Sequence, residues 1–134
     1  MSDMKAFAKW TEADRFVGAA NSGHEVVMDA GSDKTAVSPV EMVLIALCSC
    51  TASDVVSILR KKREPFTAVE VRAESERAPD PPRVFTKIKL IYRVAGKVNR
   101  KSVEDAVRLS MEKYCSVGAM LKKSVDVSSE IELV

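Results

Sequence analysis

The residues best able to do chemistry in this sequence are its three cysteines, Cys48, Cys50 and Cys115. Cys48 and Cys50 lie two residues apart inside an apolar stretch, whereas Cys115 lies far downstream. A C-x-C pair does not have the ligand spacing of a zinc finger, and the only histidine, His24, has no ligand-spaced partners, so no metal or other cofactor is predicted. Either these thiols are small core residues or one of them is a reactive nucleophile.

The stretch that carries Cys48 and Cys50 is predicted to form one long helix. Ser38 fits the N-cap, Pro39 fits the first helical position, and Glu41 completes an S-x-x-E capping box. The helix is expected to continue to about Lys61, where a run of four basic residues suits a helix C-terminus. Its length and apolar composition predict the central element of the fold.

The two neighbouring thiols are expected to point to nearly opposite faces of this helix, because each residue turns it by roughly 100°. Cys48 falls on a continuous apolar side and is interpreted as a small buried residue. The other members of that side are Ile45, Ala52, Val55 and Leu59. Cys50 shares its side with Val43 and Leu47 and then with Asp54 and Ser57, so that side turns polar after the thiol. Such a boundary lets a thiolate meet both solvent and a pocket. The pattern singles out Cys50 over Cys48, although the pattern alone still favours a structural role for Cys50.

The remaining elements predict an α+β fold with antiparallel sheets packed on the long helix. Short strands are expected within residues 5–29, and period-two alternation predicts strands over 69–74 and 87–94. Ser102 is predicted to cap a second helix. The apolar stripe of that helix is Val103, Ala106, Val107, Met111 and Tyr114. A short helical turn over 116–123 and a last strand over 127–134 follow.

Cys115 stands at the junction between these last two helical segments. It precedes Ser116, a suitable N-cap for the short turn, and backbone N–H groups at a helix start favour a thiolate. A buried cysteine at a helix junction is the other interpretation. Cys50 and Cys115 can meet only through tertiary structure.

Length and composition predict a single globular domain over residues 1–134. The chain has 46% hydrophobic and 30% charged residues and a net charge of +2, with acids and bases interleaved. This balance argues against a nucleic-acid partner, which needs a concentrated basic face. The N-terminal residues show no leader, and no segment is expected to reach the length of a membrane span. A cytoplasmic protein with free thiols and no membrane partner is therefore expected.

Two cysteine motifs resemble those of a known family. Ser38-Pro39…Glu41…Cys50, with Cys50 eleven residues after Pro39, resembles the active-site helix of the OsmC/Ohr family of osmotically inducible and organic hydroperoxide resistance proteins. Cys115-Ser-Val, between two helical segments, resembles the family's second cysteine motif, and the order of elements fits along nearly the whole chain. Residues 22–24, 55–59 and 112–117 are most similar to the YhfA-like branch.

The resemblance implies a thiol peroxidase that works as an intertwined homodimer with its sites at the subunit interface. Cys50 would attack an organic hydroperoxide or hydrogen peroxide and become a sulfenic acid, and Cys115 would condense with it to a disulfide. An external dithiol would then reduce the disulfide. The implied biological role is defence against oxidative stress.

The family also uses an arginine and a glutamate to support the thiolate, and this sequence departs from that pattern. Arg15 lies in the region of the family's arginine, and its other interpretation is an exposed hairpin residue. The family's glutamate follows the proline directly, where this chain has Val40. Glu41 is one residue late and is interpreted mainly as a capping residue. His24 is interpreted as a turn residue, with a base for Cys50 as the alternative.

A second function from a different class fits the same sequence. A non-catalytic dimeric protein of this fold would bind a small molecule, or sense redox state, without turning it over. Val40 in place of the acid favours this alternative, whereas the two retained cysteines favour the enzyme.

Overall fold

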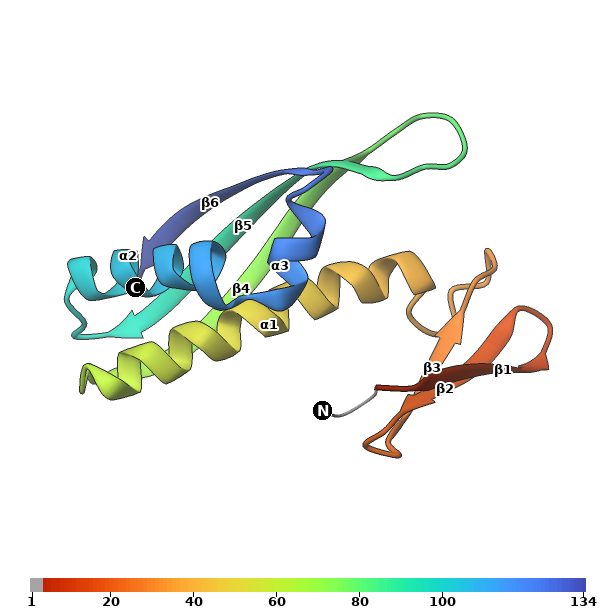
Figure 1. Ribbon diagram of the computed structural model, residues 1–134, viewed down its shortest axis with the longest axis horizontal. Coiled ribbons are helices and arrows are strands. Elements are labelled where there is room, and N and C mark those ends of the chain that lie inside the picture. The colour runs from red at the N-terminus through yellow and green to blue at the C-terminus, as the bar shows by residue number, and fades with distance from the viewer. Residues whose placement is uncertain (1–3) are drawn as a thin grey trace. The chain divides into compact units, whose positions relative to one another are not determined.

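The computed structural model describes residues 4–134 of the chain (Figure 1). Met1–Asp3, which begin the segment expected to lack a leader, lie outside the described residues. The chain divides into two compact units, an N-terminal unit that ends at Leu44 and a C-terminal unit that comprises Ile45–Val134. Each unit is described separately below. That the chain behaves as a single domain stays a prediction.

The N-terminal unit contains a three-stranded antiparallel sheet in the order β1-β2-β3. Its strands are β1 (Ala6–Glu12), β2 (Arg15–Ala20) and β3 (Glu25–Asp29). Gly23 adopts a φ of 80° in the turn between β2 and β3, a conformation that glycine adopts without the steric cost of a Cβ atom. The strands predicted within residues 5–29 are thus confirmed.

Helix α1 (Pro39–Lys61) begins with the predicted capping box. The backbone N–H of Glu41 donates to Ser38 Oγ at 3.0 Å, and the N–H of Ser38 donates to Glu41 Oε1 at 2.8 Å. Two N–H groups that the first helical turn leaves without a partner are satisfied in this way. The sequence therefore predicted both the start and the end of this helix.

The length and composition of α1 correct one expectation about membranes. The helix has 23 residues and an 18-residue window with a mean hydropathy of 2.0, so it is long and apolar enough to cross a bilayer. The expectation that no segment reaches that length is wrong. The core helix of a globular protein can have the same composition, and α1 buries one row of side chains in the C-terminal unit. That row is Leu47, Thr51, Val55 and Leu59.

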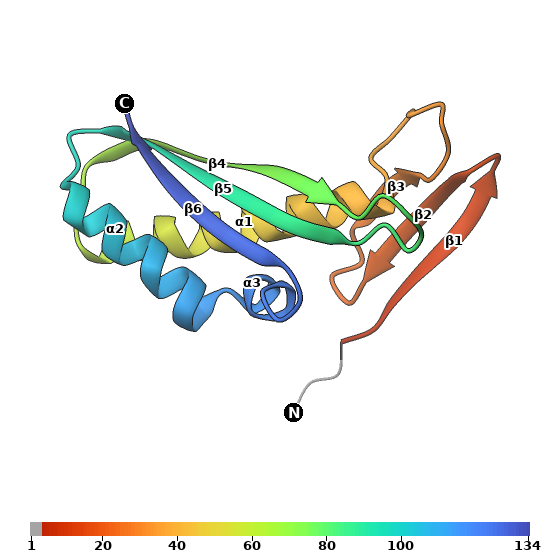
Figure 2. The ribbon, with the colours of Figure 1, turned by 90° about the horizontal axis from the view of Figure 1, so that it is seen from above.

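The C-terminal unit is built on a second three-stranded sheet, with helices on one of its faces (Figures 1 and 2). Its strands are β4 (Phe66–Arg77), β5 (Phe85–Gly96) and β6 (Asp126–Leu133), in that order. β4 pairs with β5 antiparallel, whereas β6 pairs with β5 in parallel. The α+β class is confirmed, but this sheet is mixed rather than fully antiparallel, because the chain crosses over the sheet through helices before β6.

Three helical segments make that crossover: α2 (Arg100–Leu109), the π-helical turn η1 (Ser110–Tyr114) and α3 (Ser116–Leu121). The predicted N-cap Ser102 is wrong, because Asn99 caps α2 through a bond from the N–H of Lys101 to its side chain. The predicted apolar stripe holds within α2, where Val103, Ala106 and Val107 are buried. It fails at Tyr114, which is 51% exposed. The π-turn shifts the helical phase before that residue.

The core of the C-terminal unit forms between β5 and the helices. The alternation predicted for β5 is confirmed, because Ile88, Leu90, Tyr92 and Val94 are all buried. The faces of α1 differ from the expectation. Ile45, placed on the buried side with Cys48, is 48% exposed, and Leu47, placed on the side of Cys50, is fully buried. The buried row therefore passes between the two cysteines, and both are half-buried beside it.

Candidate functional site

The C-terminal unit brings Cys50 and Cys115 together. Cys50 comes from the middle of α1 and Cys115 from the residue that joins η1 to α3. Their side chains lie close enough for the Cys50 thiol to raise the pKa of Cys115, and both thiols are free. Cys115 is 2% exposed, whereas Cys50 is half-buried, so the pair has one solvent-reachable member and one buried member. A pair of this kind can form a disulfide.

The π-helical turn fixes the position of Cys115. The N–H of Cys115 donates to the carbonyl oxygen of Ser110 at 2.7 Å, five residues earlier. Such π-turns are rare and are frequent at functional sites. The expectation that Ser116 caps the following turn is wrong: Cys115 is itself the N-cap of α3, and its Sγ accepts the N–H of Gly118 at 3.2 Å. A Cβ atom on Gly118 would lie 3.1 Å from that Sγ, so the small residue permits this approach.

Burial raises the pKa of the Cys115 thiol to about 11. The N–H of Gly118 lowers the pKa of Cys115, as expected for a helix start, but by less than burial raises it. The neighbouring Cys50 thiol and then the negative charge of Asp54 raise the pKa of Cys115 further. Cys115 is therefore a neutral thiol at physiological pH, which corrects the expectation that this helix start favours a thiolate. Burial also raises the pKa of the half-buried Cys48.

A chain of buried hydroxyl groups lies between the elements that carry the two thiols. Tyr92 Oη lies 2.8 Å from Thr51 Oγ1, and Thr51 Oγ1 lies 2.7 Å from Ser110 Oγ. Ser110 Oγ in turn donates to Asp54 Oδ2 at 2.8 Å. Tyr92, Thr51 and Ser110 are fully buried. These four residues, which we call the hydroxyl chain, connect β5, α1 and the start of η1.

The ionised carboxylate of Asp54 gives the hydroxyl chain one direction. A carboxylate can only accept, so Ser110 donates to Asp54, Thr51 donates to Ser110, and Tyr92 donates to Thr51. Every hydroxyl then donates to the next group, so no hydroxyl hydrogen in the chain lacks an acceptor. A buried polar network is stable when all of its groups are satisfied in this way. Burial raises the pKa of Tyr92 to about 12, so the phenol at the end of the chain stays protonated. From the sequence, Asp54 was expected only to make the Cys50 side of the helix polar.

Asp54 also faces a pocket of about 340 Å³ beside α1 and the end of α2. The pocket is lined by Asp54, Ser57, Ile58, Lys61, Lys62, Leu109 and Tyr114. Its walls combine apolar side chains with two lysines, one of which, Lys62, forms an ion pair with Asp105 at 3.1 Å. Asp54 is therefore the group of the hydroxyl chain that meets solvent.

Arg15 belongs to a separate polar cluster in the N-terminal unit. Its Nη1 donates to Thr35 Oγ1, and the same hydroxyl donates to a carboxylate oxygen of Asp29. Asp29 is buried and also accepts the N–H groups of Gly31 and Thr35. The hydrogen bonds from Thr35, then those from Gly31, hold the pKa of Asp29 below its usual value. The cluster holds the guanidinium of Arg15 in place. Asp29 and Thr35 were not among the site residues predicted from the sequence.

Glu41 is held by the cap of α1. Both the N–H and the hydroxyl of Ser38 lower the pKa of Glu41, so the carboxylate is ionised and engaged at the helix start. The residue before it, Val40, is 36% exposed. Like Arg15, Glu41 lies in the N-terminal unit, whereas the thiol pair lies in the C-terminal unit.

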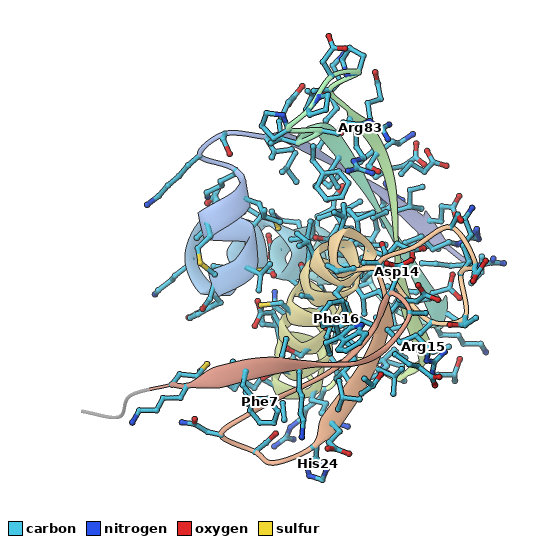
Figure 3. All side chains as sticks on the ribbon, turned by 90° about the vertical axis from the view of Figure 1, so that its right-hand side faces the viewer. Phe7, Asp14, Arg15, Phe16, His24 and Arg83 are labelled. Atoms are coloured by element: carbon cyan, nitrogen blue, oxygen red, sulfur yellow. The ribbon has the colours of Figure 1, made fainter. Side chains whose placement is uncertain are left out.

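His24 follows the glycine turn after β2, at the end of that strand opposite Arg15, and its side chain extends away from the sheet (Figure 3). This fits its interpretation as a turn residue. Within residues 4–134, no group of three or more histidine, cysteine, aspartate or glutamate side chains is arranged to hold a metal ion.

The fold and the paired thiols define an OsmC-like protein. Residues 31–130 match the family described as OsmC-like protein, and the chain belongs to that family. Its relatives include Protein YhfA of Escherichia coli strain K12, which is 46% identical over 132 residues and 98% of each chain. The membership and the YhfA-like branch predicted from the motifs are thus confirmed.

Solved structures agree with this assignment. A hypothetical protein from Aquifex aeolicus is 30% identical, with a TM-score of 0.90 over all of this chain and 98% of that one. An organic hydroperoxide resistance protein from Legionella pneumophila has a TM-score of 0.73 at 16% identity, with 98% of each chain covered. The second similarity concerns the fold alone.

Proposed function

We propose that this protein is a thiol peroxidase that reduces organic hydroperoxides or hydrogen peroxide through Cys50 and Cys115. The observation that carries the proposal is the pair of neighbouring free thiols, one half-buried and one buried. The half-buried thiol suits attack on a substrate from solvent, and the buried one suits a later reaction within the chain. Several OsmC-like neighbours are named organic hydroperoxide resistance proteins, which supports the same class of reaction.

The proposed reaction has three balanced steps. The Cys50 thiolate attacks the hydroxyl oxygen of the peroxide, the O–O bond breaks, and a sulfenic acid forms. The other oxygen leaves as an alkoxide or hydroxide, which takes a proton from solvent and becomes an alcohol or water. Cys115 then attacks the Cys50 sulfur, the S–O bond breaks, and the hydroxyl group leaves as water with the proton from Cys115. An external dithiol reduces the resulting disulfide and becomes a disulfide itself.

The roles of Arg15 and Glu41 in this proposal come from the family resemblance. Arg15 is proposed as the cation that supports the Cys50 thiolate, and its hydrogen bond to Thr35, which in turn bonds to Asp29, suits a fixed charge. The bonds of Glu41 with Ser38 support a structural role at the helix start. A supporting carboxylate for Arg15 is instead proposed at Asp29, through Thr35.

A thiol count tests the proposed function. Reaction of the reduced protein with one equivalent of cumene hydroperoxide is expected to remove two thiols per chain, because one disulfide forms. Cys48 is expected to remain free, since Cys50 is the thiol that acts on Cys115. Titration of denatured samples with a thiol reagent before and after the reaction measures the loss. An unchanged count of three thiols would contradict the peroxidase.

We also propose that the protein is an intertwined homodimer, with a cytoplasmic location suited to its free thiols. The first part of α1 carries apolar side chains that are 36 to 48% exposed in one chain, namely Val40, Val43 and Ile45. A second chain would bury them. Light scattering at micromolar concentration is expected to give twice the 14.7 kDa mass of one chain. A mass of one chain would contradict the dimer.

One observation favours a second function. Val40 occupies the position where the family has its supporting acid, and its side chain is apolar and partly exposed. A dimeric protein that binds a small molecule, or senses redox state, without turnover would not need that acid. In the thiol count above, a binding protein would keep its three thiols. A redox sensor would form the disulfide once, and with a dithiol present it would not consume further peroxide.

A further inference from the structure

Ser110 connects the hydroxyl chain to the backbone of Cys115. Ser110 uses its side chain to donate to Asp54 at 2.8 Å and its carbonyl oxygen to accept the N–H of Cys115 at 2.7 Å. Cys50 precedes Thr51 in α1, and Asp54 follows Cys50 by one helical turn. The segment that carries each thiol is therefore tied to the same buried chain. Movement of Ser110 relative to α1 would change the separation of the two sulfur atoms.

The carboxylate of Asp54 also acts electrostatically on Cys115. Three ionisable groups of the C-terminal unit interact electrostatically with the Cys115 thiol. Cys50 and Asp54 come from α1, and Tyr92 comes from β5. From the end of α3, the ammonium group of Lys122 donates to the carbonyl oxygen of Met111 at 2.8 Å. The charge of Asp54 opposes ionisation of Cys115, because two negative charges in a buried site repel each other.

We infer that Asp54 is a positioning residue for disulfide formation: through Ser110 it fixes the π-turn that carries Cys115, and its negative charge opposes a second negative charge at Cys115. This inference rests on the proposed function. A neutral Cys115 leaves Cys50 as the nucleophile toward peroxide and avoids a second negative sulfur beside the Cys50 thiolate. Once Cys50 is a sulfenic acid, Cys115 gives its proton to the departing hydroxyl group, and the S–S bond replaces the S–O bond.

Two substitutions separate the two effects of Asp54. Asp54→Asn removes the charge but retains an oxygen that can accept the bond from Ser110. Ser110→Ala retains the charge but removes the bond that holds the π-turn to α1. Asp54→Ala removes both, and because Asp54 borders the pocket, this variant is less disruptive to the core than Ser110→Ala.

The charge effect is tested by titrating Cys115 alone, in a chain with Cys48→Ser and Cys50→Ser. The ¹³Cβ chemical shift of the remaining cysteine reports its ionisation. Asp54→Asn is expected to raise the thiolate fraction of Cys115 at pH 9, because a negative charge that opposes ionisation is removed while burial continues to disfavour the thiolate. An unchanged titration curve would overturn the inference. A purely structural role for Asp54 would not move this curve.

The positioning effect is tested in a protein that carries Cys48→Ser, so that only Cys50 and Cys115 can form a disulfide. Each variant is made in this background and equilibrated in mixtures of reduced and oxidised glutathione. Here glutathione disulfide is the oxidant, and the fraction of Cys50–Cys115 disulfide is read by mass spectrometry. Ser110→Ala and Asp54→Ala are each expected to lower the equilibrium constant for this disulfide by about tenfold, because the thiols are less well placed. Ser116→Ala is the matched control, because it removes a serine hydroxyl oxygen from an exposed residue next to Cys115. It should leave the equilibrium constant for the disulfide unchanged.

Equal disulfide constants for Asp54→Ala and the Ser116→Ala control would overturn the positioning role. Neither measurement uses a peroxide, so they can succeed or fail independently of the thiol count. If both give the expected results while peroxide consumes no thiols, the proposed peroxidase fails and the coupling between Asp54 and Cys115 stands as a property of a redox-sensing pair.

Discussion

Cys50→Ser is expected to abolish peroxide consumption, whereas Cys115→Ser is expected to react once and then stop. Serine at position 50 leaves no nucleophile at the half-buried member of the pair, so the loss should reach the background rate. Without Cys115 the sulfenic acid of Cys50 has no partner within the pair, and it should accumulate or oxidise further. Peroxide consumption with a dithiol reductant measures the first effect, and mass spectrometry of the Cys115→Ser protein detects the added oxygen.

Cys48→Ser is the matched control for these variants, because it removes the same sulfur atom from the same helix. It should leave peroxide consumption near that of the unchanged protein, since Cys48 is not part of the pair of neighbouring thiols. Undiminished consumption by Cys50→Ser would remove the enzyme hypothesis. Normal turnover by Cys115→Ser would instead show a mechanism that needs only one cysteine.

Thr51→Val is expected to lower the free energy of unfolding by about 2–4 kcal/mol, although it nearly preserves the shape of the side chain. Thr51 accepts from Tyr92 and donates to Ser110 in a region that is fully buried. Valine would leave the Tyr92 hydroxyl without its acceptor and Ser110 without its donor, away from water. Denaturant unfolding at a fixed protein concentration measures the change.

Two controls make this result specific to the hydroxyl chain. Tyr92→Phe removes the terminal donor and leaves Thr51 able to donate to Ser110, so its cost should be smaller, about 1 kcal/mol. Ser57→Ala lies on the exposed side of α1 and should change the free energy of unfolding by less than about 0.5 kcal/mol. Equal stabilities for Thr51→Val and Ser57→Ala would mean that the chain contributes nothing measurable.

Local patterns predicted the elements of this fold well. The start of α1 was predictable because the capping box is a contact between residues three apart, and the buried face of β5 because alternation is local. The resemblance also selected Cys50 and Cys115 in advance. Each of these predictions depended on residues close in sequence or on motifs of fixed spacing.

The parts that could not be predicted depend on contacts between distant segments. Thr51 is buried because its partners Tyr92 and Ser110 lie 41 and 59 residues away, and nothing near it in the sequence announces either bond. The π-turn likewise has no local signal, so the helix before Cys115 was expected to keep its apolar stripe as far as Tyr114. The direction of the pKa shift of Cys115 was missed for the same reason, because its burial comes from tertiary packing.

The fixed start of α1 also determines the helical phase of Cys50. Cys50 is the eleventh residue after Pro39, which is about three full turns of an α-helix, so both residues project along the same line of the helix surface. Glu41, nine residues before Cys50, projects on the opposite side by the same arithmetic. One residue inserted between the proline and the cysteine would rotate the sulfur by roughly 100° around the axis. An insertion or deletion of a whole turn would return it nearly to its line, and thus toward Cys115.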